Sequence, residues 1–285
     1  MQRHAYTTSD GCSIDYALSA APAPVPGASA ASVPRIALVH SLALGDALWQ
    51  EVVPILAREA QVLTLDCRGH GRSSRPHAVY TTEGFARDLA ELLDHVGWAD
   101  AAVAGCSMGG CVALAFAAHH PSRLRALGLI DTTAWYGENA PSQWRERGEA
   151  ARTKGLSSLV DFQMTRWFGE AFRNGHPAAV RELVELFCAN DPVCYAATCE
   201  MLGTADLRWA LPGIKVPTAV VVGEDDYATP VAMATAMHEA IAGSTLEVLP
   251  GGRHLTPREK PVEIATILSG LLQRVDWALA PRPIS

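Results

Sequence analysis

The chain has 285 residues, 49% of them hydrophobic, and its formal net charge at pH 7 is −7. A chain of this length can build one large core that carries an insertion. It shows no basic stripe, which argues against nucleic acid as a partner, and no apolar run long enough to span a membrane.

The cysteines and the N-terminus bear on the compartment. Seven cysteines are present, an odd number, with no Cys-x-x-Cys pair and no histidine spaced for zinc. The first six residues lack the apolar core of a signal peptide. We therefore expect reduced thiols in a cytoplasmic protein, and no metal site.

The first part of the chain alternates between two kinds of apolar pattern. A hairpin is expected over residues 5–19, around the turn dipeptide Asp10-Gly11, and a flexible surface loop rich in Ala, Pro and Ser follows over 20–34. Buried strands and helices then alternate, which predicts a parallel sheet with helices on both faces. The strands are expected at 35–40, 61–66, 100–105 and 124–131, and the helices at 46–58, 82–96 and 108–119.

The rhythm changes near residue 134. Residues 135–211 have helical periodicity, for example over 157–167 and 177–189, but no strand pattern. We interpret 134–211 as a helical cap inserted between two parts of an α/β core, 1–133 and 212–285, and lying over the carboxyl ends of the strands, where ligands bind. In the second part of the core, strands are expected at 216–223 and 245–249, and helices at 230–242 and 257–275.

A serine stands between the strand at 100–105 and the helix at 108–119. The segment Gly105-Cys106-Ser107-Met108-Gly109 is a Gly-x-Ser-x-Gly motif. In a strand–turn–helix context, the two glycines permit a strained turn that exposes the serine hydroxyl above the sheet. Ser107 is therefore the predicted nucleophile, and Cys106 is expected to be a buried packing residue.

A serine hydroxyl needs a base within hydrogen-bond reach, and the base needs an orienting carboxylate. The expected order along the chain is serine, acid, histidine. His254 is the one histidine of ten that follows the last predicted strand, so it is the predicted base. The acid is expected among Glu224, Asp225 and Asp226, which follow a strand, and Asp131 at another strand end is the rival.

Acyl transfer also needs N–H donors for the oxyanion of its tetrahedral intermediate. One is expected from Met108, directly after the nucleophile, and the other from Leu42, in the loop after the strand at 35–40. His40 is expected to brace this loop rather than react. The charged segment from Asp66 to Ser73 is interpreted as a hydrogen-bonded structural turn.

Two kinds of residue in the predicted cap are candidates for binding a substrate. Trp135, just past a strand end, is predicted to line the pocket, although core packing explains it equally well. A substrate carboxylate would need a cation, because an unpaired buried charge is costly. Arg166, Arg173 and Arg208 are the candidates, each of which could equally be a surface arginine.

Together these ordered motifs resemble the α/β-hydrolases over almost the whole chain. The resemblance implies an α/β-hydrolase fold with a mostly parallel central sheet, helices on both faces and an inserted helical cap. It also favours Asp226 as the acid, because in similar sequences the acid stands four residues before the proline that opens the next helix. The motifs are His40-Ser41-Leu42, Asp66 to Ser73, Gly105 to Gly110, Gly223 to Pro230, and Gly251 to Pro257.

The predicted cap resembles that of the 3-oxoadipate enol-lactonases, which open a five-membered enol-lactone in bacterial aromatic catabolism. The matching segments are residues 166–168, 191–192, 194–199 and 205–208. Two features depart from that family. The loop from His40 to Gly45 reads His-Ser-Leu-Ala-Leu-Gly where Asn-Ser-Leu-Gly-Thr-Asp is expected, and the Ala/Pro-rich segment 20–34 is an insertion.

The resemblance implies a serine hydrolase that opens a small (enol-)lactone through Ser107, His254 and Asp226, with an acyl-enzyme and with no metal or organic cofactor. Alternatives are a carboxylesterase, or a carbon–carbon-bond hydrolase of aromatic ring-cleavage products; relatives also form peracids as a side activity. A serine in place of an aspartate argues against dehalogenase or epoxide hydrolase chemistry. A non-catalytic small-molecule receptor is a further alternative, which the three intact residues disfavour.

Overall fold

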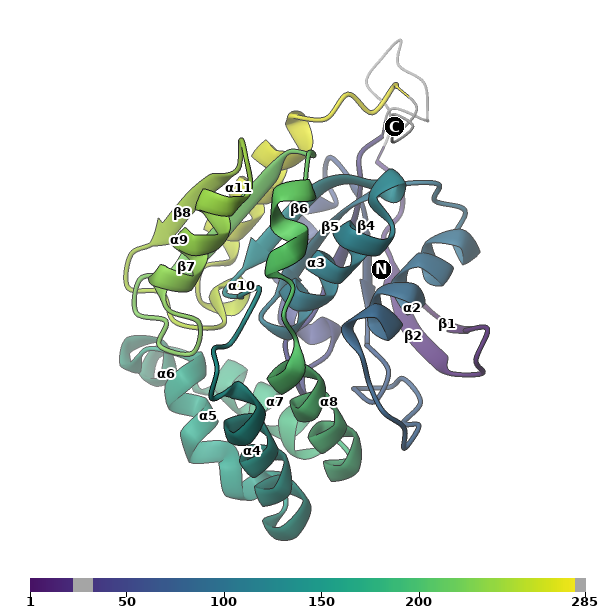
Figure 1. Ribbon diagram of the computed structural model, residues 1–285. Coiled ribbons are helices and arrows are strands. Elements are labelled where there is room, and N and C mark those ends of the chain that lie inside the picture. The colour runs from purple at the N-terminus through teal and green to yellow at the C-terminus, as the bar shows by residue number, and fades with distance from the viewer. Residues whose placement is uncertain (23–32, 280–285) are drawn as a thin grey trace.

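Residues 1–22 and 33–279 are described by the computed structural model, and they form a central sheet of eight strands (Figure 1). The order across the sheet is β1-β2-β4-β3-β5-β6-β7-β8. Strand β2 is antiparallel to both of its neighbours and every other pair is parallel, so the predicted sheet is confirmed. The strands are β1 (Gln2–Thr7), β2 (Ser13–Leu18), β3 (Arg35–Val39), β4 (Gln61–Leu65), β5 (Ala101–Cys106), β6 (Leu124–Ile130), β7 (Thr218–Gly223) and β8 (Thr245–Leu249).

Helices cover both faces of this sheet (Figure 1). Helix α2 packs against α3, and α1 packs against α11. Strands β5 and β7 are buried along their whole length, as parallel strands covered on both faces should be. The helices and short 3₁₀ helices of this part are η2 (Asp46–Trp49), α1 (Val53–Leu56), α2 (Thr82–His95), α3 (Met108–His119), η3 (Pro121–Arg123), α9 (Val231–Ala240), α10 (Thr256–Glu259) and α11 (Pro261–Gln273).

Local signals account for several element ends. The hairpin of β1 and β2 turns at Gly11, whose positive φ of 87° suits glycine. The Thr81 hydroxyl caps α2 by accepting the N–H of Gly84 at 3.0 Å. Of the loop predicted at 20–34, residues 23–32 lie outside the described part of the chain.

Two long helices expected from periodicity are wrong in extent. The segment 46–58 forms two short pieces, η2 and α1, and Pro54 stands at the start of the second. The segment 257–275 is divided into α10 and α11, and Pro261 opens α11. Proline removes a backbone donor and disfavours the helical conformation of the residue before it, so each helix restarts at a proline.

Within the described residues, five further helices lie together at one end of the molecule, beyond the sheet (Figure 1). We call α4 to α8 the helical layer. Residues 135–211 are all described, and as predicted they hold no strand, apart from one isolated bridge between Trp135 and Asp206. The elements are α4 (Ala140–Lys154), η4 (Leu156–Leu159), α5 (Val160–Trp167), α6 (Glu170–Gly175), α7 (Pro177–Cys188), α8 (Pro192–Thr204) and, after the layer, η5 (Arg208–Gly213).

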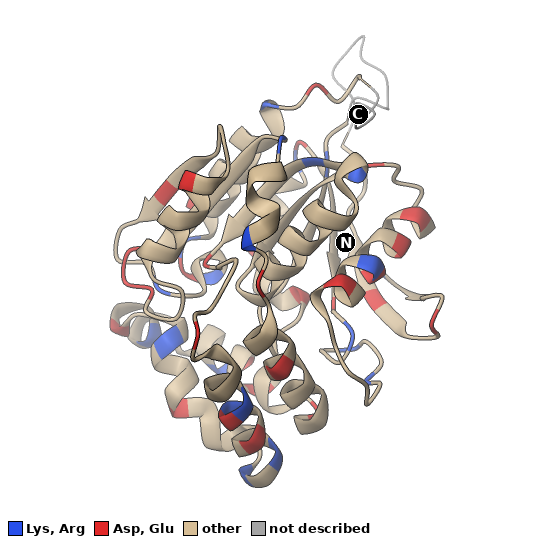
Figure 2. Ribbon diagram, viewed as in Figure 1, with Lys and Arg blue, Asp and Glu red and all other residues tan. Residues whose placement is uncertain are grey.

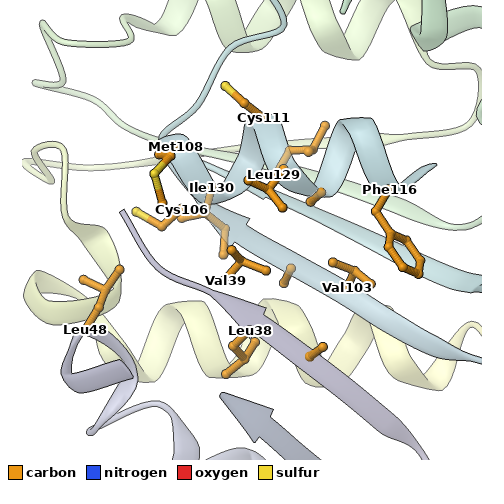
Figure 3. Close-up of a cluster of buried hydrophobic side chains, with 14 of the residues drawn as sticks. Leu38, Val39, Leu48, Val103, Cys106, Met108, Cys111, Phe116, Leu129 and Ile130 are labelled. Carbon is orange, nitrogen blue, oxygen red and sulfur yellow. The ribbon is translucent and has the colours of Figure 1, made fainter. Parts of the chain in front are cut away.

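Helix α3 lies within the core, next to the middle strands. Residues Met108 to Ala117 of α3 are all buried, which explains a helix that is apolar on every side. Figure 3 shows this cluster, in which Phe116 of α3 lies near Val103 of β5. Cys106 is fully buried, as expected, so the side chain next to Ser107 is a packing residue.

Charged residues of both signs are distributed over the elements seen in Figure 2. Residues of both signs are interspersed along the helical layer and along the helices that cover the sheet (Figure 2). No helix in residues 1–22 and 33–279 combines the length and the apolar character needed to cross a bilayer.

Candidate active site

The turn between β5 and α3 places Ser107 in a strained conformation. Its φ of 56° is unusual for a residue with a side chain, and β5 ends directly before it while α3 begins directly after it. The two motif glycines allow the close packing of this turn. A Cβ atom on Gly105 would lie 2.0 Å from the Gly109 carbonyl oxygen, and one on Gly109 would lie 2.2 Å from the Val39 carbonyl oxygen.

Gly105→Ala should therefore destabilise the protein, because its neighbours at the new methyl group are backbone atoms that cannot rotate away. Overpacking of this kind costs about 1–3 kcal/mol or more, which urea unfolding would measure. Gly270→Ala is the matched control, since nothing lies within 4 Å of a Cβ there and the site is exposed in α11. Equal stability of the two variants would contradict the packing argument.

Three buried side chains form a continuous hydrogen-bonded series at this turn. His254 Nε2 lies 2.8 Å from Ser107 Oγ, and His254 Nδ1 lies 2.8 Å from Asp226 Oδ2. The carboxylate can only accept, so Nδ1 carries the proton and Nε2 is free to accept from the serine hydroxyl. A histidine held in this tautomer can remove the hydroxyl proton.

Asp226 is kept ionised by its surroundings. It accepts hydrogen bonds from the N–H groups of Ala228 and Thr229 and from the Thr229 hydroxyl, at 2.7, 3.0 and 2.8 Å. Burial alone would raise the pKa of Asp226, but His254 and these hydrogen bonds outweigh it and hold the pKa below its usual value. The neighbouring Glu224 and Asp225 are exposed, as expected of turn residues.

The rival acid, Asp131, lies elsewhere in the network. Its carboxylate accepts from the Gly223 N–H at 3.1 Å and from the N–H and hydroxyl of Thr256 at 2.9 and 2.7 Å. It thereby joins the ends of β6 and β7 to the loop that carries His254. Burial and the nearby charge of Asp226 raise the pKa of Asp131 well above its usual value. The structure brings Asp226, and not Asp131, to the imidazole.

The loop after β3 borders the same cavity as Ser107. Leu42 lines the cavity above the serine, and Met108 begins α3, where the first N–H groups have no acceptor within the helix. Ala43 has a φ of 56°, and its carbonyl oxygen accepts from Asn190 Nδ2 of the helical layer at 2.8 Å. Sequence reasoning missed Asn190, because only the folded chain brings it to this loop.

Two residues predicted to be structural do hold this loop. His40 Nδ1 donates to the Ser41 carbonyl oxygen at 2.7 Å, and Nε2 accepts from the Cys67 N–H at 2.9 Å. Burial lowers the pKa of His40, which favours the neutral ring that this pattern requires. The Asp66 carboxylate accepts from the N–H groups of Asp46 and Arg72, so it too stabilises a turn.

A small, partly open cavity lies above Ser107. Its walls come from two parts of the chain. The core supplies Ser41, Leu42, Ser107, Ala228, Thr229 and His254. The helical layer and the segment leading to it supply Tyr136, Trp144, Arg147, Gln163, Arg166 and Trp167. The helical layer therefore faces the carboxyl ends of the strands, where a cap was expected.

Of the predicted substrate contacts, Arg166 lines the cavity but Trp135 does not. The ring of Trp135 instead stacks on Arg208, whose guanidinium carbon lies 3.7 Å from the ring centroid, and Arg208 is paired with Asp206 at 2.6 Å. Tyr136 takes the place expected of Trp135. Side chains of neighbouring residues in an extended segment point in opposite directions, so a difference of one residue along the chain determines which ring faces the cavity.

Arg147 is the charged wall residue that sequence reasoning did not name. It lies on α4, three residues after Trp144 and four before the buried Ala151, so it shares their face of the helix. The sequence of α4 is polar on most of its positions, so it did not show in advance that this face meets the cavity. Arg173 is not among the lining residues.

One group of side chains outside the cavity could hold a metal ion. Within the described part of the chain, ligand atoms of His77, Asp191 and Cys194 lie within 4.8 Å of one another. The sequence spacing gave no hint of this group, because His77 comes from a distant loop. All seven cysteines are free thiols, and all except Cys188 are buried.

Comparison with known proteins places the chain in a family. The model of the alpha/beta hydrolase fold family matches residues 34–261. The 3-oxoadipate enol-lactonase 2 of Acinetobacter baylyi is 33% identical over 242 residues, which cover 84% of this chain and 90% of that protein. The 2-hydroxymuconate semialdehyde hydrolase of Pseudomonas sp. is 27% identical, with 81% and 82% covered.

Solved structures agree with this. The enol-lactonase from Burkholderia xenovorans LB400 superposes with a TM-score of 0.87 at 31% identity, covering 95% of this chain and all of that one. A thermophilic esterase from Thermogutta terrifontis, solved with malate bound, gives a TM-score of 0.86 at 28% identity, covering 97% of this chain and 100% of that one. The chain therefore belongs to the α/β-hydrolase fold family.

Proposed function

We propose that this protein hydrolyses an ester bond, with Ser107 as the nucleophile, His254 as the general base and Asp226 as the orienting acid. The observation that carries the proposal is the buried hydrogen-bonded series from Ser107 to Asp226, which ends under an open cavity. Relatives named as enol-lactonases and esterases support the same reaction class.

The reaction proceeds in two steps. His254 takes the proton of Ser107 as its oxygen attacks the ester carbonyl, and the N–H groups of Leu42 and Met108 stabilise the oxyanion. The protonated imidazole, stabilised by Asp226, gives its proton to the leaving alcohol or enol. Water activated by His254 then attacks the acyl-enzyme and releases the acid.

The substrate proposed is a small lactone that bears a carboxylate, such as 3-oxoadipate enol-lactone. Two relatives bear that enol-lactonase name, at 33% and 28% identity, and Arg166 offers a cation in the wall of the cavity. The enol released would tautomerise to a ketone. A place in the breakdown of aromatic compounds and a cytoplasmic location belong to the same proposal.

A panel of carboxylate-bearing lactones, neutral aryl esters and ring-cleavage dienones tests this substrate class. We expect kcat/KM to be highest for a carboxylate-bearing lactone. Arg166→Ala should raise KM for that lactone about tenfold or more, because it removes a charge-assisted hydrogen bond, and should affect neutral esters much less.

Arg208→Ala is the control for Arg166→Ala, because Arg208 is paired with Asp206 and lies away from the cavity lining. Faster turnover of neutral esters than of any lactone would favour a carboxylesterase. Preference for dienones would favour the carbon–carbon-bond hydrolase; one relative is named a 2-hydroxymuconate semialdehyde hydrolase. Failure of every ester and dienone, together with no reaction with a fluorophosphonate probe, would favour a small-molecule receptor.

A further inference from the structure

We infer that Arg147 and Arg166 together form an anion subsite that holds the far carboxylate of the substrate, and that dicarboxylate products bind between this subsite and Ser107. The inference rests on the proposed function in one respect, which is that the ester end of the substrate lies at Ser107. It adds a specificity-determining residue, Arg147, and a ligand class, short dicarboxylates, that act as competitive inhibitors.

Arg147 is fixed in place by neutral groups. Its Nε donates to the Tyr195 hydroxyl at 2.7 Å. Its guanidinium carbon lies 4.7 Å from the centroid of the Trp144 ring and 5.8 Å from that of Tyr195. Aromatic faces attract a cation without neutralising it, so Arg147 keeps its full charge toward the cavity that it lines.

Arg166 reaches the same region from a different helix, α5. Its guanidinium carbon lies 4.9 Å from the centroid of the Phe162 ring, and that of Arg147 lies 5.7 Å from the same centroid. Both cations therefore lie against the Phe162 ring and line one cavity. Burial and the nearby charge of Arg147 lower the pKa of Arg166, which is consistent with mutual repulsion.

Neither arginine is paired with a carboxylate in the protein. Within residues 1–22 and 33–279, the ion pairs include the buried arginines Arg68, with Asp88, and Arg258, with Glu182, but none involves the half-buried Arg147 or Arg166. Sheltered charges are normally paired, because desolvating an unpaired charge is costly. Two neighbouring cations without an anion point to a ligand that supplies one.

The placement of the two arginines defines which end of the substrate they hold. They belong to the helical wall, whereas Ser107 and His254 belong to the core wall. A substrate whose ester carbonyl is at Ser107 thus presents its carboxylate to the arginines. Hydrolysis adds water across the ester bond, so the carbonyl becomes a second carboxylate and the product carries one at each end.

Inhibition by simple acids tests the subsite directly. Hydrolysis of a neutral aryl acetate would report binding of succinate, glutarate, adipate and pimelate, with hexanoate as the monocarboxylate that matches adipate in length. We expect at least one dicarboxylate to inhibit competitively, with a Ki at least about tenfold below that of the monocarboxylate of equal length.

Arg147→Gln should raise that Ki about tenfold and raise KM for a carboxylate-bearing lactone more than it lowers kcat. Arg145→Gln is the matched control on the same helix, because Arg145 is 66% exposed and pairs with Glu200 at 3.1 Å; its Ki should equal that of the wild type. In the double variant Arg147→Gln with Arg166→Gln, the loss of binding free energy should be smaller than the sum of the two single losses, because both arginines contact one carboxylate.

Arg147→Lys keeps the charge without the planar fork, so it should retain part of the affinity, and thermal unfolding would identify a variant that has lost its fold. An unchanged Ki in folded Arg147→Gln and folded Arg147→Lys would overturn the subsite. Equal inhibition by dicarboxylates and monocarboxylates would overturn it as well.

Calorimetric titration of adipate separates the two proposals. Ester hydrolysis without preferential dicarboxylate binding would overturn the anion subsite and leave the proposed reaction standing. Dicarboxylate binding that depends on Arg147, in a protein that hydrolyses no ester, would support the subsite and remove the proposed reaction.

Discussion

Ser107→Ala is expected to lower kcat for the best ester at least about a thousandfold while leaving the fold intact, because the oxyanion donors alone supply only a small part of such catalysis. The hydroxyl lost is the one that lies 2.8 Å from His254 Nε2. Steady-state kinetics measure the effect, and circular dichroism with thermal unfolding verifies the fold.

Ser157→Ala is the control for this change, since Ser157 is an exposed serine of the helical layer. A fluorophosphonate probe should label the wild type and Ser157→Ala but not Ser107→Ala. A Ser107→Ala enzyme that keeps a tenth of the wild-type activity would show that the nucleophile lies elsewhere.

The sequence predicted the parts of the candidate site that depend on local order. The strand, glycine turn and helix around Ser107 are contiguous, so their packing follows from a few residues. His254 followed from its place after the last strand. Local order was not enough to identify Asp226, because three adjacent acids follow the same strand. Only the resemblance to a family singled out the one that is buried against the imidazole.

The parts that were missed depend on tertiary contacts. Arg147, Tyr136 and Asn190 reach the site from the helical layer or the segment leading to it, and periodicity does not tell which helix face meets the core. The arginine candidates show the same limit: Arg166 and Arg208 look alike in sequence, yet one lines the cavity and the other pairs with Asp206. The broken helices at Pro54 and Pro261 are a different case, because the proline that ends the helical pattern is itself visible in the sequence.

The two walls of the cavity would have different roles in the proposed reaction. The core wall holds the groups that would move protons and stabilise charge, and these are fixed by strand ends and by the bonds of Asp131. The helical wall holds charge and aromatic rings that would select the substrate. Asn190 links the two, because it bonds the strained Ala43 of the loop above Ser107. Changes in the helical wall should therefore alter KM and specificity before they alter kcat.

Asp226→Asn is expected to lower kcat on the order of 10⁴-fold, because an amide cannot replace the carboxylate that fixes the proton on His254 Nδ1 and stabilises the imidazolium. Asp131→Asn is the matched comparison, a second buried aspartate at a neighbouring strand end. It should keep kcat within about tenfold, since its carboxylate bonds Gly223 and Thr256 rather than the imidazole.

Although Asp131→Asn should keep most of kcat, it should lower the stability of the protein. The amide introduced by Asp131→Asn would direct N–H groups at donors that now meet a carboxylate, which costs about 1–3 kcal/mol for each buried group left unpaired. Urea unfolding of both variants measures the loss of stability, and kcat on one ester measures the loss of catalysis. If Asp131→Asn abolished hydrolysis while remaining folded and Asp226→Asn kept it, the acid would be Asp131, and the short contact between Asp226 and His254 would be structural.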